Sequence, residues 1–171
     1  MHDLARETRG QFKSNEPGSR PHFSPLVENV LMVAILWMAI VVRLPYLARG
    51  FNYDEFYTLY SCIQQPNLFD ALFKDYWLTN HLGYTALDYL SCRLFGISEW
   101  AMRLPALLFG VGSIVLLWRW GRGRFGRPAV ILAAACLAVS PVHAIWSSIA
   151  RGYSALICFT LLSTCLHFRL I

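Results

Sequence analysis

The chain has 171 residues, of which 56% are apolar and 15% aromatic, and it carries a formal net charge of +5. This composition excludes an ordinary soluble domain and indicates a polytopic membrane protein. The positive charge does not indicate nucleic-acid binding, because the arginines flank long apolar runs and so mark membrane topology. The five cysteines lack CxxC spacing. They predict neither a metal site nor a disulfide framework, although Cys62 and Cys92 would be able to pair if both faced the outside.

The N-terminal part divides into a tail and a first apolar segment. Residues 1–24 hold basic residues and prolines but little apolar material, which predicts a disordered basic tail in the cytoplasm. Residues 26–47 match the roughly 20 apolar residues that cross about 30 Å of hydrocarbon. Basic residues precede this segment and few follow it, so we expect the N-terminus inside and the next residues outside. The segment begins too far from Met1 for a secretory signal, so we expect it to be retained.

Residues 48–100 are expected to form an external loop with short helices that lie on the membrane surface. An apolar repeat of the type i, i+3, i+4, i+7 predicts the first helix, just after Asp54 and Glu55. Its members are Phe56, Leu59, Tyr60 and Ile63. Two interpretations of Asp54 stay open: it caps this helix, or it is a fixed carboxylate that acts as a general base or a metal ligand.

Two more short helices are predicted in this loop. One begins at Asn67 and repeats apolar residues on one face, at Phe69, Leu72, Phe73 and Tyr76. The other covers 82–95, which at about 14 residues and 1.5 Å per residue is too short to cross a membrane. We expect Asp88 and Arg93 on this helix to be solvated or paired. Glu99 and Arg103 lie one helical turn apart and are expected to form a local ion pair.

Three later apolar segments complete an all-α fold. Residues 104–120 open with Pro105 near the first turn and lead into four arginines within nine residues, which is typical of a cytoplasmic loop. Residues 129–146 return to the outside, and residues 154–168 go back in. Together with 26–47, these segments predict four transmembrane helices.

This topology places Asp54, Glu55, His81 and Arg151 on one membrane face. A carboxylate can take the proton of an acceptor hydroxyl or hold a divalent cation, and a guanidinium can neutralise a phosphate leaving group. The set therefore suits a reaction on a lipid-linked phosphate.

Several short motifs follow one another in a specific order. They are Arg43-Leu-Pro, Tyr53-Asp54-Glu55-Phe56-Tyr57, Asn80-His81, Leu94 to Pro105, Arg124-Phe-Gly-Arg127, Ser140-Pro-x-His143 and Ala150-Arg151-x-Tyr153. In this order they resemble the polytopic GT-C glycosyltransferases of the protein-mannosyltransferase and RgtA/B/C/D-like kind. The chain departs from that pattern at Leu82 and Gly83, which replace prolines, and at Ile149, where many relatives carry Glu.

The resemblance implies transfer of a sugar from a polyprenyl-phosphate donor at the extracytoplasmic face of the plasma membrane. It implies that Asp54 and Glu55 are catalytic and that His81, Arg151 and Tyr153 bind the donor phosphate, with a divalent cation on Asp54 as an open alternative. Two further alternatives stay open: His81 is an interfacial histidine bonded to backbone, and Tyr153 is an aromatic residue of the membrane interface. The partners implied are the bilayer and the lipid-linked donor, and no nucleic acid.

The resemblance covers nearly all of the chain from residue 26 but only about the N-terminal third of such an enzyme. We therefore expect little activity from these 171 residues alone, and a downstream-encoded remainder as a further partner. The alternative is an inactive truncated relative or a non-enzymatic accessory membrane protein. A small transporter is disfavoured, because the acidic residues lie in a loop rather than within spans.

Overall fold

The computed structural model describes residues 24–74 and 81–170. Within these ranges the regular elements are helices and there are no strands, so the predicted all-α fold is confirmed. The helices are α2 (Pro25–Leu47), α3 (Tyr53–Thr58), the π-helix η1 (Leu59–Ile63), α4 (Leu68–Phe73), α5 (Leu82–Phe95), α6 (Glu99–Gly121), α7 (Arg127–Val139), α8 (Pro141–Trp146) and α9 (Tyr153–Leu170). The predicted tail, apart from Ser24, and the predicted positions of Tyr76 and Asn80 lie outside the described residues.

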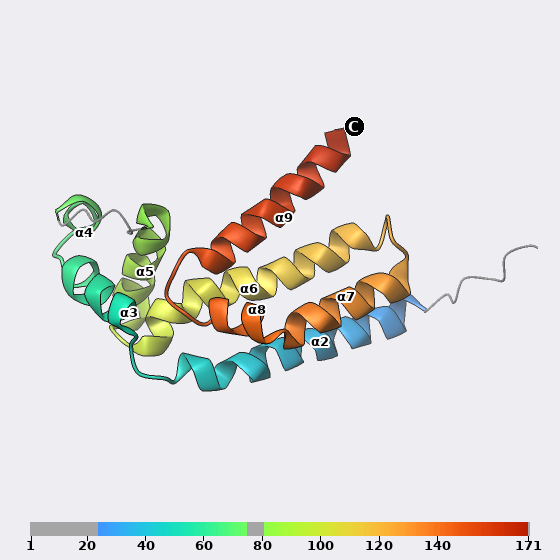
Figure 1. The fold of residues 1–171 in the computed structure, drawn as a ribbon, viewed down its shortest axis with the longest axis horizontal. Coiled ribbons are helices and arrows are strands. Elements are labelled where there is room, and N and C mark those ends of the chain that lie inside the picture. Colours follow the sequence, from blue (N-terminus) through green and yellow to red (C-terminus); the bar gives the residue numbers. More distant parts are fainter. Residues whose placement is uncertain (1–23, 75–80, 171) are drawn as a thin grey trace, which may run out of the picture.

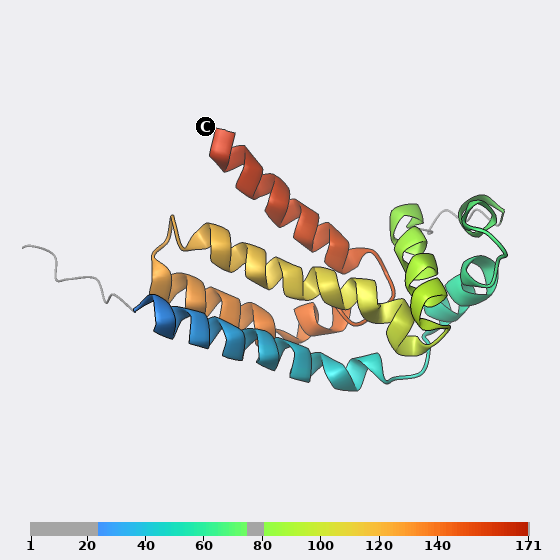
Figure 2. The ribbon, with the colours of Figure 1, turned by 180° about the vertical axis from the view of Figure 1, so that it is seen from behind.

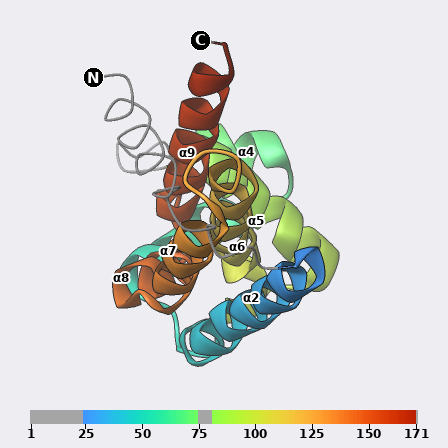
Figure 3. The same cartoon turned by 90° about the vertical axis from the view of Figure 1, so that its right-hand side faces the viewer.

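The long helices α2, α6 and α7 lie side by side, and α9 leans away from them (Figures 1 and 2). Helix α6 contacts α2, α5, α7 and α9, and it lies at the centre when the molecule is seen end-on (Figure 3). In the described part of the chain, α2, α6 and α9 are the three helices long and apolar enough to cross a membrane. The protein is therefore a polytopic membrane protein, while four crossings stay a prediction.

The predicted third segment, 129–146, is not one continuous helix. It is interrupted at Ser140, between α7 and α8. Pro141 stands at the first position of α8, and the Ser140 hydroxyl accepts the N–H of His143 at 3.4 Å. Proline has no N–H to continue the hydrogen bonds of α7. That N–H would have reached the carbonyl of Leu137. The next carbonyl, that of Ala138, has no helical donor because α7 ends at Val139, and it accepts a hydrogen bond from Nη1 of Arg43 at 3.0 Å. A guanidinium from α2 thus caps the interrupted helix.

A buried polar network around Arg43 joins three helices. Its Nε donates to Oγ of Ser147 at 2.7 Å, and its Nη2 lies 2.6 Å from Nδ1 of His143. Because arginine only donates, Nδ1 must accept, and the His143 proton on Nε2 points to Ser113 Oγ at 3.0 Å. The Ser113 hydroxyl then donates to the carbonyl of Gly110 at 2.7 Å. Every described member of this network has a partner, which fixes α2, α6 and α8 against one another.

Helix α6 begins five residues before the predicted start, at Glu99 instead of residue 104. Pro105 therefore lies inside the helix and leaves the carbonyl of Ala101 without its usual donor. The Ser91 hydroxyl of α5 donates to that carbonyl at 2.6 Å. Pro105 thus does not mark the start of α6. It leaves a carbonyl that accepts a hydrogen bond from α5.

A second buried cluster closes the other end of the bundle. Glu28 near the start of α2 accepts a hydrogen bond from Nε1 of Trp118 at 2.9 Å and forms ion pairs with Arg127 at 3.3 Å and Arg122 at 3.9 Å. The start of α2 and the arginine loop therefore lie at the same end, away from α3, α4 and α5 (Figure 1). This is the relative placement that the predicted topology requires, whereas the side of the membrane stays a prediction.

Candidate functional site

Helix α3 begins at Tyr53, and its N-cap residue is Asn52, not Asp54. Asn52 has the extended backbone of an N-cap residue, and its N–H donates to Oε2 of Glu55 at 3.0 Å. The interpretation of Asp54 as a cap is therefore wrong. Asp54 occupies the second helical position, and its side chain is 63% exposed.

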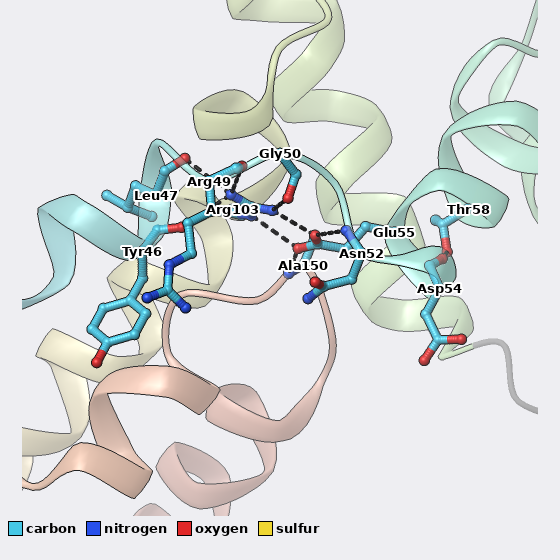
Figure 4. Close-up of polar contacts among 10 residues, drawn as sticks. All are labelled: Tyr46, Leu47, Arg49, Gly50, Asn52, Asp54, Glu55, Thr58, Arg103 and Ala150. Carbon is cyan, nitrogen blue, oxygen red and sulfur yellow. Dashed lines mark hydrogen bonds and ion pairs between the residues drawn. The ribbon is translucent and has the colours of Figure 1, made fainter.

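Glu55, in contrast, is completely buried and forms an ion pair with Arg103. Nη2 of Arg103 lies 2.6 Å from Oε2 of Glu55, and Nε lies 2.9 Å from Oε1 (Figure 4). The predicted local pair between Glu99 and Arg103 is wrong, because Arg103 turns toward the first loop instead. Its remaining donors reach four backbone carbonyls, those of Tyr46, Leu47, Arg49 and Gly50.

The carboxylate of Glu55 also holds a distant loop in place. Its Oε1 accepts the N–H of Ala150 at 2.7 Å. Burial alone would raise the pKa of Glu55, but the hydrogen bonds from Arg103, Ala150 and Asn52 outweigh burial and lower it. Glu55 is therefore ionised and has both oxygens occupied. Its predicted catalytic role stays a prediction, and the geometry favours positioning.

Asp54 reaches the same loop from the outer side. Nη2 of Arg151 lies 2.8 Å from Oδ2 of Asp54, and the Arg151 side chain is 13% exposed. An ion pair with one partner this exposed contributes no more than about 1 kcal/mol. The loop is thus held by Glu55, and the Asp54–Arg151 pair can exchange partners with a ligand at little cost.

The other two predicted site residues lie next to this loop. The rings of His81 and Tyr153 have centroids 5.8 Å apart, in an edge-to-face arrangement. A Cβ on Gly152 would lie only 3.4 Å from Cγ of His81, so glycine lets the loop approach closely. The structure therefore brings Asp54 together with Arg151, and His81 together with Tyr153, on two sides of the same short segment.

An apolar cleft of about 730 Å³ opens where this segment meets α5, α6 and α9. Its polar rim includes His81, Gly152 and Tyr153, and its apolar wall includes Leu87 and Phe109. A second apolar hollow of about 450 Å³ shares Leu87 and Phe109 and runs on between α5 and α6. Sequence reasoning missed this groove, because its walls are ordinary apolar positions on three separate helices.

Asp88 was predicted to be solvated or paired, and the structure contradicts this. Asp88 is fully buried on the inner face of α5, and neither of its oxygens has a hydrogen-bond partner within the described ranges. Burial raises the pKa of Asp88 well above its ordinary value, and the charge of Glu55 adds to the rise. Arg93, on the outer face, donates to the carbonyls of Gln65 at 2.7 Å and Pro66 at 3.1 Å.

Metal and disulfide chemistry find little support in the described residues. Cys62 and Cys92 are both buried and form no disulfide with each other, and burial raises the pKa of Cys92 to about 11. Across residues 24–74 and 81–170, no three His, Cys, Asp or Glu side chains gather in a way that would hold a metal ion. A cation on Asp54 stays a prediction.

Residues 82–171 match the family model described as dolichyl-phosphate-mannose-protein mannosyltransferase, which is more than half of the chain. The chain belongs to this family. The matched mannosyltransferase region includes α5, the central helix α6, the broken α7–α8 segment and the loop with Arg151. The acidic pair of α3 lies before the matched residues, so its place in the site comes from the structure.

Two Bacillus subtilis (strain 168) proteins are similar to parts of the chain. "Putative mannosyltransferase YycA" is 39% identical over 75 residues, which are 43% of this chain and 11% of YycA. "Putative mannosyltransferase YkcB" is 32% identical over 82 residues, which are 48% of this chain and 12% of YkcB. The aligned part thus spans about an eighth or less of each relative. No solved structure matches the chain.

Proposed function

We propose that this protein is a membrane glycosyltransferase that moves a sugar, mannose or a related one, from a polyprenyl-phosphate donor to an acceptor hydroxyl. The observation that carries this proposal is the Asp54–Arg151 pair, because Arg151 directly precedes the residues that form the polar rim of the apolar cleft. A base and a phosphate-binding cation beside a lipid-sized groove are what such a transfer needs. Membership of the mannosyltransferase family supports the same reaction class.

In this proposal the polyprenyl chain lies in the groove between α5, α6 and α9. Its phosphate lies at the rim, near His81, Arg151 and Tyr153. The acceptor oxygen forms a bond with the anomeric carbon while the bond from that carbon to the phosphate oxygen breaks. Asp54 receives the acceptor proton, and Arg151 stabilises the charge on the departing polyprenyl phosphate. A divalent cation at Asp54 remains an alternative way to stabilise this charge.

Glu55 has a different part in this proposal. Since both of its oxygens are occupied, it positions Ala150 and thereby Arg151 and does not exchange protons itself. The reaction takes place on the extracytoplasmic face of the plasma membrane, where the predicted topology puts α3 and the α8–α9 loop.

The test is an assay of membranes that contain the full protein, supplied with a radiolabelled polyprenyl-phosphate mannose. We expect label to move from the lipid to an acceptor or to water in a protein-dependent way. Membranes from cells that lack the protein are the control. Equal consumption of several lipid-phosphate sugars in both membranes would contradict the proposal and favour an accessory role.

A further inference from the structure

A small pocket beside the buried Glu55–Arg103 pair takes no part in the proposed donor site. Its volume is about 60 Å³, and it shares no lining residue with the apolar cleft. Arg49 and Asn52 form one wall, and Ser148 and Ile149 form the other. The pocket is large enough for one small polar group and too small for a lipid chain.

The two backbone segments that line the pocket also carry Asp54, the proposed base, and Arg151. Asn52 precedes Asp54 by two residues, and Ile149 precedes Arg151 by two residues. The bond from Ala150 N–H to Glu55 holds these two segments together. A group bound in the pocket would therefore lie at the edge of the reaction site.

The charge of the pocket comes from Arg49. Its guanidinium stacks over the ring of Tyr46 at 4.7 Å, which fixes its direction. The other cation in the wall, Arg103, is neutralised by Glu55, whereas no carboxylate of the described residues pairs with Arg49. Figure 4 shows the Arg49 side chain pointing toward the α8–α9 loop and the Asp54 side chain on the far side of Glu55. The pocket thus presents an unbalanced positive charge.

We infer that this pocket is the acceptor subsite and that it binds a carboxylate or phosphate group of the acceptor through Arg49. The inference rests on the proposed function and adds the class of acceptor, which is an anionic molecule whose hydroxyl reaches Asp54. The donor phosphate keeps its own place at the rim of the cleft.

The first test separates use of the acceptor from use of the donor. The labelled polyprenyl-phosphate mannose is given to membranes with the full protein, and label is counted separately in endogenous acceptor and in free sugar released by water. Arg49→Gln should lower transfer to the acceptor by about tenfold or more, since a charged hydrogen bond is lost. Donor hydrolysis should be unchanged.

A charge inserted opposite Arg49 gives a second, independent variant. Ile149→Glu should neutralise the pocket and lower acceptor transfer as Arg49→Gln does, whereas Ile149→Gln, which has the same size, should retain most of it. If both Ile149 variants behave alike, or if Arg49→Gln transfers normally, the acceptor subsite is wrong. If the unchanged protein consumes no donor, the proposed function itself is wrong.

Binding can be measured without turnover by modifying arginines with phenylglyoxal in nanodiscs of neutral lipid. Inorganic phosphate is the probe, and mass spectrometry reports each modified residue. We expect millimolar phosphate to protect Arg49 and not the exposed Arg119. Equal loss of labelling at both residues would overturn the inference. Protection of Arg49 by phosphatidylglycerol in the disc, without phosphate, would also overturn it, because the pocket would then hold a lipid headgroup.

Discussion

Glu55 and Ala150 are 95 positions apart, and Oε1 of Glu55 accepts the N–H of Ala150 at 2.7 Å. The neighbouring carboxylate, Asp54, forms an ion pair with the neighbouring residue, Arg151, at 2.8 Å. Two adjacent acids thus contact two adjacent residues of a remote loop, one inside the protein and one at its surface. The buried contact holds the loop, and the exposed contact can exchange partners at little cost.

Removing the charge of Glu55 should destabilise the protein strongly. Glu55→Gln leaves the buried guanidinium of Arg103 without a counter-charge, and the loss of one partner from a buried pair costs about 3–5 kcal/mol. Thermal unfolding in detergent measures this. Glu99→Gln is the matched control, because Arg103 pairs with Glu55 and not with Glu99. Equal melting temperatures for the two variants would show that the buried pair does not stabilise the fold.

Because the pKa of Glu55 is lowered in the folded protein, the stability that its carboxylate provides should be lost at acid pH. Because the folded state lowers this pKa below its ordinary value of 4.5, the carboxylate contributes fully above that pH. The contribution is lost as pH falls through the folded-state value. We expect the difference in unfolding free energy between the natural protein and Glu55→Gln to shrink below about pH 4.5. A difference that stays constant down to the lowest accessible pH would contradict this.

Asp88 has the opposite effect on stability. Its raised pKa means that the folded state keeps a proton which the unfolded chain loses above the ordinary value of 3.8. Stability therefore falls as pH rises above about 4, and Asp88→Asn should melt at a higher temperature than the natural protein at pH 8. Near pH 4 the two should differ much less. A lower melting temperature for Asp88→Asn at pH 8 would mean that the charged form has a partner.

The close approach of α6 to α8 can be tested at Gly110. A Cβ there would lie 2.2 Å from Cβ of Ser147, which is itself bonded to Arg43. Gly110→Ala should therefore cost about 1–3 kcal/mol through overpacking. Gly112→Ala, two positions along the same helix, is the control, because the nearest atom would be Sγ of Cys158 at 3.9 Å. Equal stability of the two variants would show that the helices can separate freely.

The sequence predicted the helices well where an apolar pattern and a terminal signal agreed, as in α2, α4 and α9. It failed where a tertiary contact overrode a local rule. Spacing favoured Glu99 as the partner of Arg103, but burial selected Glu55. The break at Ser140–Pro141 depends on Arg43, which is remote in the sequence and accommodates the freed carbonyl of Ala138.

The candidate site was predictable only in part. Alternating membrane sides placed Asp54, His81 and Arg151 on one face, and the structure brings the loops that carry them together. No local pattern separates the exposed Asp54 from the buried Glu55, because adjacent residues of one helical turn differ only in the direction in which their side chains point. Sequence spacing also carried no signal for the cleft or for the Arg49 pocket, since each is assembled from several helices.

The central claim is that Asp54 acts through its negative charge. Asp54→Asn keeps the size of the side chain and removes only a surface ion pair, so it should change stability by no more than about 1 kcal/mol. Removal of a general base should lower transfer from labelled polyprenyl-phosphate mannose by about a hundredfold or more. Asp70→Asn, the same change at a half-buried acid of α4 outside the candidate site, should leave transfer unchanged. The account predicts a well-expressed, normally melting Asp54→Asn protein with almost no transfer, and it would be contradicted if that protein transferred sugar as fast as the Asp70→Asn control.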